Sequence, residues 1–391
     1  MPYRRVAAVP GAVRLLGSSV VARLPLGTST IALLLFMHDV AGSFAAAGAV
    51  VAAFTVTGAI AAPVQGRLID AAGAAPVLVA CALGHAAGLA AFPLAADRAP
   101  VAALIVLAAV SGALLPPISS CARAVWPEVA PDGPTRDAGY ALDAVAQELI
   151  WICGPLLVAV CVAAADPALA VLLSAGLTLA GTLVFAAAPL VRAHGRHGRA
   201  SRAPVLRAPG MARVLGCTAV MGFGLGASEI AFPAAAVELG RPALGPVLLA
   251  LMSVASLATG LAYGARARRA ASLETRHGAL LLVLAACTLP MAAAQDLGTA
   301  LAFSLVAGAA WSPVLACQYA LVAELAPPGA VTTAFAWSTS SVVCGLALGT
   351  ALAGSLVEAS SAAAGFLLAA AAYGAGGAWA IAPRRSPPAV A

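Results

Sequence analysis

Long apolar runs, separated by short clusters of glycine, proline and charged residues, are the main pattern along this chain. A helix needs about 20 mostly apolar residues to cross the hydrocarbon core of a bilayer. Twelve runs reach that length, with approximate cores at 14–37, 44–65, 76–96, 100–123, 141–165, 168–191, 213–237, 243–264, 277–295, 298–322, 332–357 and 362–382. The pattern predicts an all-α integral membrane protein with 12 transmembrane helices.

Composition excludes a soluble globular protein. Hydrophobic residues make up 62% of the chain and charged residues only 9%, whereas a soluble domain has about a quarter of its residues charged. The 8 cysteines stand singly within apolar runs, as small buried hydrophobic residues do. The sequence has no P-loop, metal-ligand cluster or nucleophile constellation, so we expect no enzyme, no metal and no nucleic-acid partner.

The basic residues, all of them arginine, predict the orientation. If both termini are cytoplasmic, 18 of the 21 arginines fall at cytoplasmic ends and loops, and only Arg98 and Arg241 fall on the other side. Arg23 lies within the first run. Cytoplasmic loops carry an excess of positive charge in membrane proteins. We therefore expect a multi-pass protein of the cytoplasmic membrane with both termini cytoplasmic.

The chain contains an internal repeat of about half its length. The segment "RLLGSSVVARLPLGTSTIA" from Arg14 matches "RVLGCTAVMGFGLGASEIA" from Arg213 at 9 of 19 positions. An even number of spans separates the copies, so both have the same orientation. We expect two pseudo-symmetric six-helix bundles, residues 1–191 and 213–391, joined by a basic linker at 192–212. The linker is predicted either to contact anionic lipid or a regulator, or simply to be solvated.

The segment "GRLIDAAG" at 66–73 resembles the loop signature G-x-L-x-D-x-x-G of the major facilitator superfamily. Twelve spans, a parallel repeat and a long basic central loop agree with that family over essentially the whole chain. In the family, the loop aspartate contacts a span-four arginine and the start of span eleven, and so latches the outward-facing state. The resemblance implies gating roles for Gly66, Asp70, Gly73 and Arg123, with Thr332 near the helix start.

Two departures from the family pattern affect what the resemblance implies. Alanines stand where the family usually has arginine or lysine around the aspartate, which predicts a weaker latch: Ala71, Ala74 and Ala75. The back half resembles actinobacterial-type members that are mostly regarded as exporters of unassigned substrate. Drug-exporting branches carry a glycine-rich pattern in span five, of which only Gly154-Pro155 remains here.

Carboxylates in the spans are candidates for proton exchange, because ionisable groups in a bilayer usually face a bundle interior or a water cavity. For a helix starting near Ala141, Glu148 would lie roughly 10 Å into the membrane and Asp143 only about 3 Å, with Gln147 on the face of Asp143. A carboxylate removed from water can exchange protons near neutral pH. We predict proton coupling by Glu148, then Glu229, with Asp143 as a third candidate. A structural tie between helices is the alternative.

Arg23, about 16 Å along the first run, is predicted to pair with one of these acids or to bind an anionic group of the substrate. Thr28 and Gln318 lie on helices that line the cavity in the resembled family. Phe232 and Trp311 could offer apolar or stacking surface there. Ordinary packing is the alternative for Phe232 and Trp311. For Arg23, the alternatives are a structural tie between helices and snorkelling to the interface.

These features predict secondary active transport of a small molecule by alternating access. Proton-coupled efflux, as an antiporter, of an apolar or weakly basic compound is the leading prediction, because charge is sparse in the spans and the span-five remnant favours export. An importer or facilitator of a small anionic metabolite is one alternative, and a transport-inactive membrane sensor or scaffold is another. We expect a monomer in the lipid bilayer that uses the proton gradient and no cofactor.

Overall fold

The computed structural model describes residues 2–96, 98–130, 133–195, 204–266 and 272–383, and every regular element within these ranges is a helix. Twelve helical segments are long and apolar enough to cross a membrane, which confirms the number of spans predicted from the hydrophobic runs. Span five differs most clearly from its predicted limits, because it begins at Gly133 rather than near Ala141.

The described residues of the first half form nine helices. They are α1 (Pro2–Ala8), α2 (Ala12–Ala41), α3 (Phe44–Ala72), α4 (Ala74–Ala95), α5 (Val101–Ala113), α6 (Ile118–Val129), α7 (Gly133–Ala164), α8 (Pro167–Ala186) and α9 (Pro189–Ala193).

The second half contains seven α-helices and three short 3-10 turns in the described ranges. The α-helices are α10 (Met211–Glu238), α11 (Gly245–Gly264), α12 (Leu273–Thr288), α13 (Leu297–Gly308), α14 (Trp311–Leu325), α15 (Val331–Ala359) and α16 (Ala362–Ile381). The 3-10 turns are η1 (Val205–Arg207), η2 (Pro242–Leu244) and η3 (Leu289–Ala293).

Spans four and ten each consist of two helices rather than one continuous helix. The predicted run 100–123 is interrupted between α5 and α6, where Pro116 and Pro117 follow each other. Proline has no backbone N–H and its ring clashes with the preceding turn, so α5 ends just before this pair. The predicted run 298–322 is interrupted after Gly308, at the equivalent place in the repeat. Both halves therefore divide the same span at the same level.

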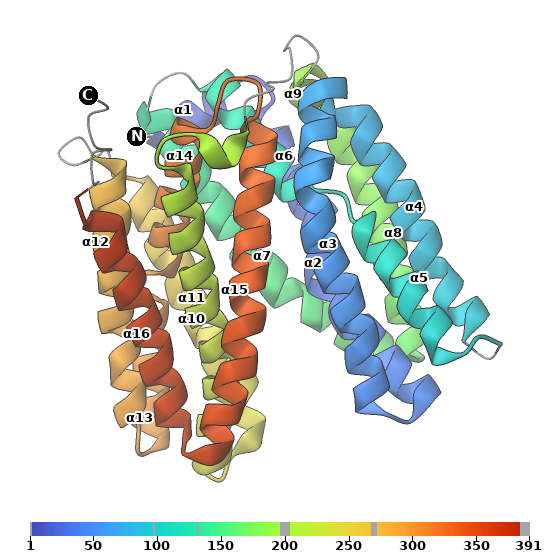
Figure 1. The fold of residues 1–391 in the computed structure, drawn as a ribbon, viewed down its shortest axis with the longest axis vertical. Coiled ribbons are helices and arrows are strands. Elements are labelled where there is room, and N and C mark those ends of the chain that lie inside the picture. Colours follow the sequence, from blue (N-terminus) through green and yellow to red (C-terminus); the bar gives the residue numbers. More distant parts are fainter. Residues whose placement is uncertain (1, 97, 131–132, 196–203, 267–271, 384–391) are drawn as a thin grey trace, which may run out of the picture.

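The two halves form separate helical bundles that meet at one end of the molecule (Figure 1). The helix α1, the short helix α9 and the C-terminal end of α16 lie at this end, which we call the terminal side. Contacts between the halves join α3 to α15, and α7 to α11 and α14. Away from the terminal side, the ribbons of the two bundles diverge.

Buried apolar side chains follow the same division. One cluster joins the two halves and includes Tyr140 of the first half together with Tyr319 and Phe335 of the second. Two further clusters belong to one half each, the first around Phe92 and the second around Phe232. The halves thus share one core where they meet and keep separate cores where they diverge.

Glycines let the central helices of each half approach closely. A Cβ added at Gly154 of α7 would lie 2.6 Å from the Cα of Gly27 in α2. In the second half, a Cβ added at Gly222 of α10 would lie 2.9 Å from the Cα of Val342 in α15. Burial from water does not drive helices together inside a bilayer. Small residues at such crossings stabilise the packing because they increase van der Waals contact between the helices. Gly154 therefore has a packing role in the fold.

Candidate functional site

The loop aspartate closes the terminal side by capping a helix of the other half. Asp70, near the end of α3, accepts hydrogen bonds from the backbone N–H groups of Thr332 (3.2 Å) and Thr333 (2.9 Å) and from the Thr333 hydroxyl (2.7 Å). Both threonines lie in the first turn of α15, where unpaired N–H groups and the helix dipole favour a negative charge. We call Asp70, Thr332 and Thr333 the latch.

Two glycines give the latch its close fit. A Cβ added at Gly66 would lie 2.9 Å from the Thr333 Cα and 3.1 Å from the Ala336 Cβ, so glycine lets α3 lie directly against α15. Gly73 follows α3 with a φ of +90°, a conformation that glycine adopts at no steric cost. Both glycines of the loop signature therefore have a steric reason to be glycine.

A second contact between the halves lies at the equivalent place in the repeat. A Cβ added at Gly264, the last residue of α11, would lie 2.5 Å from the Ala141 Cβ in α7. Nearby, Arg276 of α12 lies 3.5 Å from Asp137 of α7, in a partly exposed ion pair. Sequence reasoning missed this pair, because each residue had the appearance of an ordinary charge at the end of a span.

Asp143 binds two arginines inside the first half. Its Oδ1 lies 2.6 Å from Arg23 Nη2, and its Oδ2 lies 2.7 Å from Arg123 Nε. Arg23 and Asp143 are fully buried and Arg123 is almost so. Burying an unpaired charge costs several kcal/mol, and close pairing offsets that cost. The carboxylate therefore ties together α2, α6 and α7.

This arrangement corrects one expectation. Arg123 bonds Asp143 and the side-chain oxygen of Gln147 (3.3 Å) rather than the latch residue Asp70. Because α7 begins at Gly133, Asp143 also lies roughly 15 Å along the helix rather than near its start. The shared face of Asp143 and Gln147 is confirmed, since both side chains bind Arg123. Two guanidinium partners favour the structural tie that was the alternative for Asp143.

Arg123 also reaches the second half. Its guanidinium carbon lies 3.8 Å from the centre of the Tyr319 ring in α14, which is a cation–π contact. Tyr319 packs at an angle against Tyr140 (6.3 Å) and Phe335 (6.4 Å). The charged cluster of the first half is thus linked to the shared core. Tyr319 was not among the candidates from the sequence.

Glu148 lies where α7 faces two helices of the second half. The Ser256 hydroxyl of α11 donates a hydrogen bond to Glu148 Oε1 (2.8 Å), and the Ser312 hydroxyl of α14 lies 2.8 Å from that of Ser256. Glu148 is 3% exposed, and no ion pair joins it to any residue that the structure describes. Neither serine was predicted, because serine is common in packed membrane helices.

The structure places Glu229 apart from this cluster. It lies on α10 with an exposed side chain, and no ion pair joins it to another residue within the described ranges. The structure therefore brings Glu148, Asp143 and Arg123 to the meeting of the halves, and leaves Glu229 elsewhere.

The polar candidates for substrate binding form hydrogen bonds within their own halves. The Ser174 hydroxyl donates to the Thr28 hydroxyl (2.7 Å), and the Gln318 amide nitrogen donates to the Ser338 hydroxyl (3.0 Å). The amide oxygen of Gln318 is buried and has no hydrogen-bond partner among the described residues. That oxygen keeps Gln318 a candidate, whereas Thr28 is satisfied by its neighbour.

The aromatic candidates are buried packing residues in this conformation. Phe232 meets Phe366 edge to face at 5.0 Å, and Trp311 lies 6.3 Å from the Tyr373 ring. Both candidates are at most 7% exposed. Their contact with a substrate stays a prediction.

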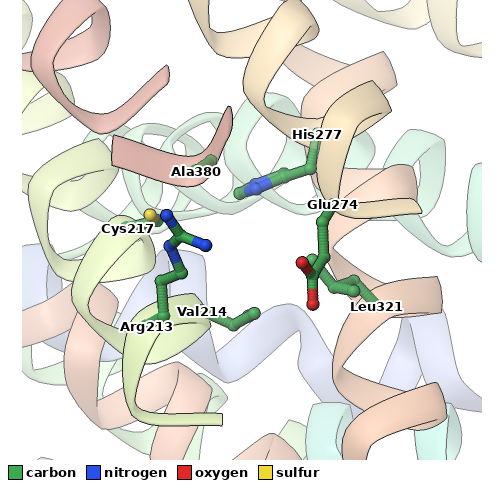
Figure 2. A pocket seen from close by; sticks show the side chains of 7 residues that line it. All are labelled: Arg213, Val214, Cys217, Glu274, His277, Leu321 and Ala380. Atoms are coloured by element: carbon green, nitrogen blue, oxygen red, sulfur yellow. The ribbon is translucent and has the colours of Figure 1, made fainter. Parts of the chain in front are cut away.

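A small pocket lies inside the second half, between α10, α12, α14 and α16 (Figure 2). The ring of His277 points into it, opposite Arg213 and Cys217, and Glu274 lies on the same side as His277. Its free space is about 10 Å³, about what one water molecule needs. The Arg213 guanidinium donates to the carbonyls of Trp379 and Ala382 at the end of α16. The pocket is too small for a transported molecule.

Solved structures of transporters share this fold. A bacterial homologue of the iron transporter ferroportin, in an outward-facing state, aligns with a TM-score of 0.76 at 14% identity, over 94% of this chain and 98% of that chain. The E. coli fucose:proton symporter gives 0.71 at 14% identity, over 95% and 98%. The human organic anion transporter MFSD10 (TETRAN) gives 0.64 at 19% identity, over 97% and 100%.

At the level of sequence, no curated protein matches the chain significantly. The profile of the Major Facilitator Superfamily, however, matches residues 15–276, which is more than half of the chain. That match, the twelve apolar helices and the shared fold agree with one another and with the latch geometry. The chain belongs to the major facilitator superfamily and is a membrane transporter rather than an enzyme.

Proposed function

We propose that the protein is a proton-coupled secondary transporter that works by alternating access, and that Glu148 carries the proton. Family membership supports transport. The position of Glu148 supports coupling: it is a buried acid on α7 whose hydroxyl partners, Ser256 and Ser312, belong to the opposite half. A side chain at this place changes its surroundings whenever the halves move apart.

The coupling follows from the cost of burying charge. When α7 separates from α11 and α14, Glu148 loses its partners and meets water, where its carboxyl can lose a proton. The ionised carboxylate resists return to the dry interface, because an unpaired buried charge is unfavourable. A proton or a cationic substrate removes that penalty. Two species that compete for one carboxylate are exchanged across the membrane, which is antiport.

For direction and substrate, we propose efflux of an apolar or weakly basic compound, with the terminal side in the cytoplasm. The arginine distribution supports this orientation, and the scarcity of charge in the spans supports the substrate class. The Gly154-Pro155 pair supports export less than the sequence suggested, because Gly154 has a packing role against Gly27.

One observation favours a second candidate function, transport of a small anion. The charged cluster contains two arginines for one aspartate, and Arg23 Nη1 is buried without a hydrogen-bond partner among the described residues. An anionic group that reached α2 would find a free donor there. The likeness to a human organic anion transporter adds only fold similarity at 19% identity.

The test compares cells that produce the wild type, Glu148→Gln or Glu324→Gln, challenged with apolar and cationic toxins. Glu324 is an exposed acid near the end of α14 and serves as the matched control. We expect the wild type and Glu324→Gln to protect cells and Glu148→Gln to fail, at equal membrane levels on an immunoblot.

Transport into proteoliposomes, with a pH-sensitive dye inside, separates the remaining outcomes. Equal toxin-driven proton movement by wild type and Glu148→Gln would remove Glu148 from the mechanism. Uptake of small anions without any toxin movement would select the second candidate. Absence of movement for both classes would favour a sensor or scaffold.

A further inference from the structure

The start of the linker between the halves lies directly on the turn that carries the latch aspartate. The backbone N–H of Ala74 donates to the carbonyl of His194 (3.3 Å), just after α9. Gly195 follows with a φ of +79°, and a Cβ added there would lie 2.7 Å from the carbonyl oxygen of Ile69. The linker therefore begins in close contact with the segment that holds Asp70.

The side chain of His194 connects the two halves. Its Nδ1 lies 2.8 Å from Glu128 Oε1 at the end of α6, and its Nε2 lies 2.9 Å from the Thr332 hydroxyl at the start of α15. His194 is 3% exposed. Thr332 is also a latch residue, whose backbone N–H bonds Asp70. The first half thus holds the same turn of α15 at two points.

We propose that His194 is a positioning residue of the latch, which holds the Thr332 hydroxyl against the first half and makes closure of the terminal side depend on the charge of its ring. The linker then contributes to the conformational equilibrium in addition to joining the halves. This inference rests on the alternating access proposed above, but it does not depend on the substrate or on Glu148.

Both charge states of the ring fit the observed geometry. Histidine changes charge between about pH 5 and 8. In the neutral ring, Nδ1–H donates to Glu128 and Nε2 accepts from the Thr332 hydroxyl. In the charged ring, both nitrogens donate, and the positive charge faces the Glu128 carboxylate. Closure is therefore compatible with both states and gains an ion pair at lower pH.

Charged groups from three elements lie around His194. Glu128 contributes a half-exposed carboxylate from α6, and Asp70 contributes a buried one from α3. Arg192 lies two residues before His194, in α9, and is exposed to solvent. The first turns of α4 and α15 contribute no charged side chain. Because Glu128 is half exposed, we expect a modest gain, about two- to five-fold in the ratio of closed to open molecules.

The test measures the distance between the halves on the terminal side in the full chain. Spin labels are attached to cysteines introduced at the exposed positions Arg14 in α2 and Glu324 in α14. The exposed native cysteines, Cys153 and Cys344, are replaced by serine. Pulsed electron paramagnetic resonance in lipid nanodiscs at pH 8 and pH 6 then gives the closed and open populations.

We expect the open population of the wild type to fall about two- to five-fold from pH 8 to pH 6. His194→Ala should open the terminal side at both values and lose most of this response. His194→Gln keeps one donor and one acceptor without the charge, so it should stay nearer the wild type at pH 8 and lose the response. Glu128→Gln should weaken the response while His194 remains.

Asp70→Asn serves as the positive control for opening, because it weakens the other attachment of α15. If Asp70→Asn opens the terminal side and His194→Ala does not, the positioning role is overturned. If His194→Ala opens it but retains the full pH response, the dependence on ring charge is overturned. None of these readouts requires transport, so a failure of the proposed proton coupling at Glu148 would be seen separately.

Discussion

At the scale of single residues, the partners of an acid decide its chemistry more than its depth does. Asp143 and Glu148 lie five residues apart on α7, and both are buried. Asp143 meets two guanidinium groups within its own half, whereas Glu148 meets serine hydroxyls from the other half. The first arrangement holds a bundle together, and the second depends on how the two bundles are placed. This difference is why we assign proton coupling to Glu148.

Replacing Asp143 by alanine should destabilise the protein strongly. The change leaves two buried arginines without their carboxylate, a loss of about 3–5 kcal/mol when one partner of a buried ion pair is removed. The measurement is thermal stability of the purified protein in detergent. Asp137→Ala is the control, because its partly exposed ion pair with Arg276 should contribute about 0–1 kcal/mol. Equal losses in the two variants would contradict the assigned role of Asp143.

At the scale of elements, glycine positions determine which helices can cross closely. The crossing of α2 and α7 places Gly27 against Gly154, and the crossing of α3 and α15 depends on Gly66. The first crossing builds one bundle, and the second joins the two bundles. The missing Cβ of glycine therefore allows a bundle to pack in one place and allows the terminal side to close in the other.

Gly154→Ala should reduce stability and folded yield, because its Cβ would lie 2.6 Å from the Gly27 Cα and would push α7 away from α2. Gly176→Ala in α8 is the matched control, since a Cβ there has no neighbour within 4 Å. Alanine is about 1 kcal/mol better than glycine inside a helix, so the control should be neutral or stabilising. Size-exclusion profiles and melting curves compare the two. A stable Gly154→Ala protein that has lost only transport would instead give Gly154 a direct functional role.

At the scale of the whole molecule, several separate contacts close the terminal side. They include the latch, the His194–Thr332 contact, the Arg276–Asp137 pair, the Arg123–Tyr319 contact and the N-terminal helix. In α1, the Tyr3 hydroxyl donates to the carbonyl oxygen of Leu261 in α11 (2.5 Å), so a helix of the first half reaches the second. Because closure is divided among separate contacts, they can be broken one after another during a transport cycle.

Tyr3→Phe should raise the open population on the terminal side. The change removes one hydrogen bond between the halves, worth about 0.5–1.5 kcal/mol, which corresponds to an increase of about two- to twelve-fold. The spin-label pair at positions 14 and 324 measures this increase. Arg4→Gln changes an exposed neighbour on the same helix and should have little effect. An unchanged distance distribution in Tyr3→Phe would show that α1 does not help to hold the halves together.

The sequence by itself determined the membrane class, the twelve spans, the parallel repeat and the family resemblance, because each depends on local hydrophobicity or on a short motif. It also singled out Glu148 and Asp70. Span five was predicted too short. The first turns of α7 are polar, so the start of the hydrophobic run does not mark the start of the helix. The division of spans four and ten was missed for a similar reason, since proline pairs and glycines do not interrupt an apolar run.

Only the tertiary structure decided which side chains meet. Arg23 and Asp143 are separated by 120 positions, Glu148 and Ser256 by 108, and His194 and Thr332 by 138. Hydrophobic periodicity tells which residues are apolar, but neighbouring helices in lipid are selected by the detailed fit of small and polar side chains. The partners of the acids, and with them the roles proposed for these acids, therefore followed from the packing of the two bundles and could not be obtained from the spacing of residues along the chain.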